Sequence, residues 1–103
     1  MNELRYRDAQ ENWTELYYAQ DPQADYSFDD IVLFQSKEDP DKYALFFDSG
    51  CSCPSPFEEN PGGDVYTKEQ LLKLMNAWAK NENDWTDRTE KVMKEWILEN
   101  IKP

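Results

Sequence analysis

The sequence predicts an α+β fold, in which two C-terminal helices cover one face of a small antiparallel sheet with a central hairpin. Runs rich in aromatic and β-branched residues fill the first two thirds of the chain, and helical periodicity replaces them at Thr67. Strands followed by helices are typical of this class. At 103 residues the chain is expected to form a single domain, with a strand-rich part over 1–66 and a two-helix part over 67–103.

Three segments have the composition of strands. Residues 13–18, WTELYY, suit a short strand. Residues 26–36, YSFDDIVLFQS, and 42–48, KYALFFD, are joined by the turn sequence KEDPD, which predicts an antiparallel hairpin. Both hairpin strands contain continuous apolar runs, so both faces of the sheet should be at least partly covered.

Two helices are predicted to supply the cover. The first, over 67–81, opens with a Thr-x-x-Gln capping box at Thr67, and the second, over 87–102, opens with an Asp-x-x-Glu box at Asp87. Apolar side chains recur along one face of each helix: Leu71, Leu74, Met75 and Trp78 in the first, and Val92, Met93, Trp96, Ile97 and Ile101 in the second. This spacing indicates two amphipathic helices packed on the sheet.

The charge of the chain is uneven. Its formal net charge is -11, and residues 1–66 hold fifteen acids and four bases, whereas residues 67–103 hold seven of each. Such a surface repels nucleic acid and attracts a basic protein, including one whose groove ordinarily binds nucleic acid. The alternative is that the excess of acid only keeps a small protein soluble.

The most acidic stretch predicts a binding surface over residues 8–36. Seven acids and no base lie between Arg7 and Lys37, and aromatic residues are interleaved with them. Aromatic side chains often anchor protein interfaces. Because the acids at its centre lie in or beside a turn and at the start of a strand, we expect them to be exposed. The predicted contacts with a partner are Asp21, Asp25, Asp29, Asp30, Tyr26 and Phe28.

Both cysteines lie in the segment DSGCSCPSPFEE, residues 48–59. A structural zinc ion needs four ligands, and the chain has neither His nor a third Cys. A disulfide between Cys51 and Cys53 would close a very short, strained loop. Without His, neither a serine nor a cysteine triad can form. We therefore predict no metal, no cofactor and no catalytic residue, with a redox or metal role for the two cysteines as the alternative.

The spacing within this segment favours a rigid corner. Ser55, Pro56 and Glu58 have the order of an N-cap, a first helical residue and a capping-box partner, which predicts one helical turn from Ser55. Gly50 suggests a positive φ or a close backbone approach. The residues assigned to the corner, with small thiols packed inside it, are Gly50, Cys51, Cys53, Pro54, Ser55, Pro56 and Glu58.

The run YALFFDSGCSCPSPFEE, residues 43–59, resembles the signature of a group of small, uncharacterised bacteriophage proteins. In that group a strand ending in Asp-Ser-Gly leads into Cys-Ser-Cys-Pro. The resemblance implies a phage gene product made in a bacterial cytoplasm. It implies no activity and no catalytic residue.

Together these observations predict a non-enzymatic protein that acts by binding a basic host protein. Its acidic surface would resemble nucleic acid, and its target would be a nucleic-acid-binding or defence protein. The alternative is an accessory protein with a redox or metal role at Cys51 and Cys53. No apolar run approaches the roughly 18 residues that a membrane span needs, and the N-terminus does not read as a signal peptide, so a cytoplasmic location is expected.

Overall fold

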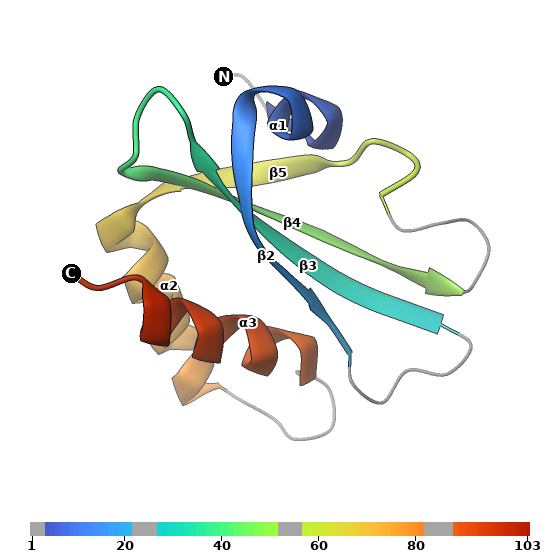
Figure 1. Cartoon of the computed structure of the whole chain (residues 1–103). Coiled ribbons are helices and arrows are strands. Elements are labelled where there is room, and N and C mark those ends of the chain that lie inside the picture. The colour runs from blue at the N-terminus through green and yellow to red at the C-terminus, as the bar shows by residue number, and fades with distance from the viewer. Residues whose placement is uncertain (1–3, 22–26, 52–56, 82–87) are drawn as a thin grey trace.

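The computed structural model describes residues 4–21, 27–51, 57–81 and 88–103. Within these ranges the chain forms five strands and three helices, which confirms the predicted α+β class (Figure 1). The strands form one sheet in the order β1-β5-β4-β3-β2, with every neighbouring pair antiparallel. The elements are β1 (Leu4–Arg5), α1 (Tyr6–Asn12), β2 (Trp13–Gln20), β3 (Ser27–Ser36), β4 (Lys42–Cys51), β5 (Gly62–Thr67), α2 (Lys68–Lys80) and α3 (Arg88–Asn100).

The predicted hairpin is confirmed as the centre of the sheet. β3 pairs with β4 without a register shift, from Ser27 opposite Cys51 to Gln35 opposite Tyr43. At the turn, the Ser36 hydroxyl accepts hydrogen bonds from the backbone N–H groups of Glu38 and Asp39. The strand predicted over 13–18 is also present, and it extends to Gln20 as the edge strand β2.

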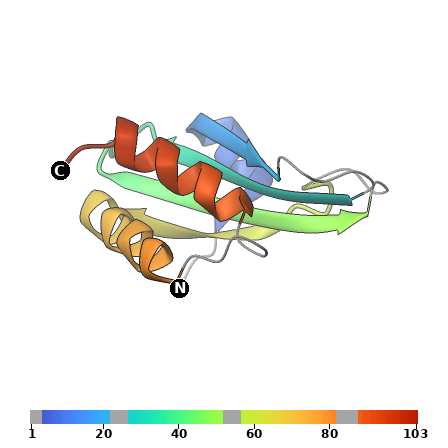
Figure 2. The same ribbon diagram turned by 90° about the horizontal axis from the view of Figure 1, so that it is seen from below.

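Helices α2 and α3 lie side by side on one face of the sheet, as predicted (Figure 2). The capping box at Thr67 is complete, because the Thr67 hydroxyl accepts from Gln70 N–H and the Gln70 side chain accepts from Thr67 N–H. Asp87 lies outside the described residues. The core on this side, here called the helix-face core, contains Ala19, Ile31, Leu33, Tyr43, Leu45, Leu71, Met75, Met93, Ile97 and Ile101.

The opposite face is covered by α1 and by Phe57, which the sequence did not predict. The seven-residue helix α1 has no side-chain cap, so its packing on the sheet must hold it in place. Gly63 of β5 permits close approach here, because a Cβ atom at Gly63 would lie 2.6 Å from the ring of Phe46. The second core, here called the α1-face core, contains Ala9, Val32, Phe34, Ala44, Phe46 and Phe57.

Candidate functional site

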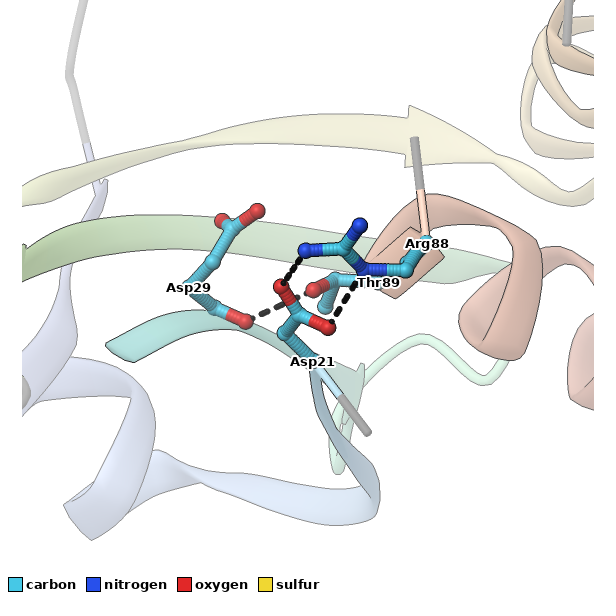
Figure 3. A network of polar contacts seen from close by, with 4 residues as sticks. All are labelled: Asp21, Asp29, Arg88 and Thr89. Atoms are coloured by element: carbon cyan, nitrogen blue, oxygen red, sulfur yellow. Dashed lines mark hydrogen bonds and ion pairs between the residues drawn. The ribbon is translucent and has the colours of Figure 1, made fainter. Parts of the chain in front are cut away.

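The first predicted contact, Asp21, lies just after β2 and is bound to the start of α3. Arg88 donates to both carboxylate oxygens, from Nε to Oδ1 at 2.9 Å and from Nη2 to Oδ2 at 3.0 Å (Figure 3). Only 11% of the Asp21 side chain is exposed. The expectation that Asp21 is exposed and free is therefore wrong, because a base distant in sequence folds onto it.

Asp29 belongs to the same network through its backbone. Its carbonyl oxygen accepts from the Thr89 hydroxyl at 2.8 Å (Figure 3). The same oxygen also accepts from Asp21 N–H at 3.1 Å. Its side chain is half-buried. Burial raises the pKa of the Asp29 carboxyl, and the nearby Asp21 carboxylate raises it further, while Thr89 and Arg88 oppose the shift. The network fastens α3 to the end of the β2–β3 pair.

Asp30 is buried, with 2% of its surface exposed, so the expectation that it is exposed is also wrong. The Tyr18 hydroxyl donates a 2.6 Å hydrogen bond to its Oδ2 atom. Burial raises the pKa of the Asp30 carboxyl; the bond from Tyr18 opposes that rise, and Asp48, directly opposite on β4, adds to it. Burial and the same hydrogen bond raise the pKa of Tyr18 as well. Asp30 faces the sheet interior because it shares the face of Val32 and Phe34.

Asp48 connects this polar cluster to the segment that carries the cysteines. Its Oδ2 atom accepts from Phe57 N–H at 2.7 Å, and its Oδ1 atom accepts from Ser49 N–H at 3.0 Å. The Phe57 ring stacks on Tyr6, with 4.5 Å between ring centroids. Phe57 has a φ of 63° and Asn60 a φ of 55°. Asp48 thus orients the returning chain so that Phe57 enters the α1-face core.

This geometry corrects the helical turn predicted from Ser55. A left-handed Phe57 cannot continue a right-handed helix, and residues 57–59 form a turn instead. Glu58 is exposed in that turn. Gly50 is an extended residue of β4 opposite Phe28, and no glycine in the described ranges has a positive φ, so the positive φ suggested for Gly50 is wrong.

Most of the remaining predicted site residues lie outside the described residues. Asp25, Tyr26, Cys53, Pro54, Ser55 and Pro56 fall between the described ranges. Phe28 and Cys51 are placed in β3 and β4 by their backbones alone. Within the described ranges no group of three or more Cys, Asp or Glu could hold a metal ion. The redox and metal alternative for the cysteines stays a prediction.

Sequence reasoning missed the roles of Tyr18 and Asp48. Tyr18 carries no local signal, because its partner is set by the pairing of β2 with β3. The position of Asp48 could have been found, since a hairpin with a short turn fixes its register and places Asp48 opposite Asp30.

Exposed carboxylates gather instead at the start of the acidic stretch. Asp8 and Glu11 lie on α1 three residues apart, and Glu15 lies on β2; all three side chains are exposed. Glu15 lies opposite Phe34 on β3, so its side chain projects from the face of the sheet that carries the α1-face core. Burial raises the pKa of the Tyr6 hydroxyl, and the Glu15 carboxylate raises it further. These three residues are called the α1–β2 acidic surface below.

The fold and this site define a small α+β protein with an exposed acidic surface beside an edge strand. The chain belongs to a family described as a domain of unknown function, DUF7574, whose model matches residues 6–100. No curated protein and no solved structure matches the chain. Across the described ranges no helix is long and apolar enough to cross a membrane.

Proposed function

We propose that this protein acts without catalysis, by binding a basic protein through the α1–β2 acidic surface. Asp8, Glu11 and Glu15 are exposed, and α1 and β2 together contain one base against these three acids, the exposed Arg7, four residues before Glu11. This unbalanced exposed charge is the observation that carries the proposal. It steers a basic partner toward the surface and repels nucleic acid.

The proposed partner is a host protein whose basic groove ordinarily binds nucleic acid, such as a nucleic-acid enzyme or a defence protein. An acidic surface can occupy that groove in place of the phosphate backbone. The resemblance of residues 43–59 to bacteriophage proteins supports this choice of partner, because a phage product meets host proteins in the bacterial cytoplasm.

The position of the surface revises the predicted contacts. Asp21 and Asp30 are engaged within the fold, by Arg88 and Tyr18, so the proposed contact is made by Asp8, Glu11 and Glu15 instead. Phe28, in β3, remains a proposed contact, as do Asp25 and Tyr26, which lie outside the described residues.

The test is capture of the partner from a bacterial lysate, followed by measurement of affinity against salt. Replacing Asp8 by Asn and Glu11 and Glu15 by Gln should weaken binding by about tenfold to a hundredfold, from roughly 0.5 to 1 kcal/mol for each rim charge. The loss should fall mainly on the association rate and shrink at high salt.

A matched control neutralises three exposed acids of the neutral C-terminal part, Glu69, Glu95 and Glu99. This control variant has the same net charge as the variant with Asp8, Glu11 and Glu15 neutralised. It should bind the partner much more tightly than that variant does. Equal weakening by the two variants would mean that total charge alone matters. An acidic partner, or affinity that is indifferent to salt, would overturn the proposed function.

A further inference from the structure

The edge strand β2 presents backbone groups that the sheet does not use. β2 ends the strand order of the sheet, and among the strands that the structure describes β3 is its single neighbour. Its first half contains a register shift between Glu15 and Tyr17, whereas Tyr17–Gln20 pairs regularly with β3. An edge of this kind is a template on which another strand can form.

The outward-facing groups can be assigned from one hydrogen bond. Asp21 N–H donates to the Asp29 carbonyl at 3.1 Å, so these opposed residues form a hydrogen-bonded pair. Bonding alternates along an antiparallel ladder. Ala19 and Tyr17 therefore bond inward to β3, while Tyr18 and Gln20 direct their N–H and C=O groups outward.

The composition of β2 would allow a further strand to pair with this edge. Proteins often protect edge strands with Lys or Pro, and the β2 sequence WTELYYAQ contains neither. The side chains of Thr14, Glu15 and Gln20 are exposed along the strand. The bulge protects the first half, so the regular half Tyr17–Gln20 is the segment suited to pairing.

The acidic residues near the β2 edge favour one kind of strand as its partner. Glu15 lies on β2 itself and Glu11 precedes it on α1, and both are exposed, whereas Arg88 at the other end of the strand is bound to the Asp21 carboxylate. A second copy of the chain would bring like charges together, since each copy carries a net charge of -11. A strand containing Lys or Arg would instead place opposite charges across the new pair.

We propose that β2 receives an extended, basic segment of the partner protein as an additional strand, hydrogen-bonded to Tyr18 and Gln20. This inference rests on the proposed function and specifies how the partner binds. Backbone pairing would supply affinity, and Glu11 and Glu15 would favour basic side chains.

The experiment uses a synthetic peptide of roughly eight residues, an ordinary strand length, in which Val alternates with Lys, and a control peptide in which Val alternates with Glu. Gln20→Pro removes one outward N–H without breaking an inward bond, and Pro is tolerated at such edge positions. Gln20→Ala removes the side chain and keeps the N–H. We expect the Val-Lys peptide to bind Gln20→Ala like the wild type and to bind Gln20→Pro about tenfold more weakly.

Amide hydrogen exchange provides a second measurement that does not depend on the proline variant folding. The Val-Lys peptide should slow exchange at Tyr18 and Gln20 of the wild-type chain more than at Tyr17 and Ala19, whose amides are already bonded to β3. Equal affinity of the two Gln20 variants, or no added protection at Tyr18 and Gln20, would overturn strand addition. Protection of these amides by self-association without peptide would overturn the basic occupant in favour of a second copy.

The two proposals fail separately. If neutralising the α1–β2 acidic surface weakens partner binding while Gln20→Pro has no effect, the proposed function stands and strand addition is wrong. If binding is indifferent to salt and to the acidic residues, the proposed function fails first.

Discussion

The two faces of the sheet are built in different ways. The helix-face core is mainly aliphatic and is covered by two helices whose apolar residues recur with helical spacing. The α1-face core contains three phenylalanines among its six residues, and Tyr6 packs against them, stacked on Phe57 and edge-on to Phe34 and Phe46. It is bordered by carboxylates and closed by a left-handed turn. One face depends on local periodicity, and the other depends on contacts between segments distant in sequence.

Stability should fall most when a large side chain is removed from either core. Phe46→Ala removes the ring that contacts Tyr6, Phe34 and Gly63, and should lower the free energy of unfolding by about 3–5 kcal/mol. Met93→Ala, at an equally buried position on the inner side of α3, should lower it by about 2–5 kcal/mol. Urea unfolding measures both losses.

Hydrogen exchange would show whether the two faces unfold independently. Phe46→Ala should speed exchange in α1 more than in α2, because α1 depends on the α1-face core. If exchange accelerates equally in both helices, the two faces unfold as one unit. The two cores would then differ in amino-acid composition and not in stability.

A smaller loss of stability is expected when a side-chain hydrogen bond beside each core is removed. Tyr18→Phe leaves the buried Asp30 without its Tyr18 donor and should cost about 1–3 kcal/mol. Thr89→Val removes a donor to the Asp29 carbonyl, which keeps its bond from Asp21 N–H, so the cost should be about 0.5–1.5 kcal/mol. Thermal or urea unfolding would compare them, and a greater loss from Thr89→Val would contradict the ranking.

The smallest effect concerns the pH dependence of stability. The raised pKa of Asp30 means that the folded chain holds this proton more tightly than the unfolded chain does. From about pH 4, the ordinary Asp value, up to the raised pKa, the free energy of unfolding therefore falls as pH rises. Asp30→Asn removes this contribution, so its stability should decline less than that of the wild type across this window.

Urea unfolding at several pH values would measure that difference. Asp8→Asn is the control, because it removes one exposed charge and leaves the buried cluster intact. Parallel stability curves for wild type and Asp30→Asn would show that burial of Asp30 has no consequence for stability.

The helix-face half of the fold could be predicted because its signals are local. Thr67 and Gln70 specify a capping box within one helical turn, and the β3–β4 hairpin is specified by two apolar runs and a short turn. The α1 face could not be predicted in this way. Helix α1 has seven residues and no side-chain cap. Strand β1 has two residues, and they pair with β5 residues that are distant in the sequence.

The candidate site, too, could be predicted only in part from the sequence. The sequence located the acidic stretch, and the α1–β2 acidic surface falls inside it. It could not distinguish exposed acids from engaged ones, because Asp21 is paired with Arg88 of α3 and Asp30 faces Tyr18 of β2. Exposure is set by tertiary contacts, and composition alone does not report them.

The uninterrupted β3–β4 hairpin has a consequence for the order of folding. Its strands are joined by a short turn, so the entropy lost on closing it is small, and the hairpin can form early. The pairing of Leu4 with Gly63 must close a loop that includes the hairpin itself, and it gains little until Phe57 is in place. We therefore expect the N-terminal segment to be the last part of the chain to dock during folding and the first to detach during unfolding.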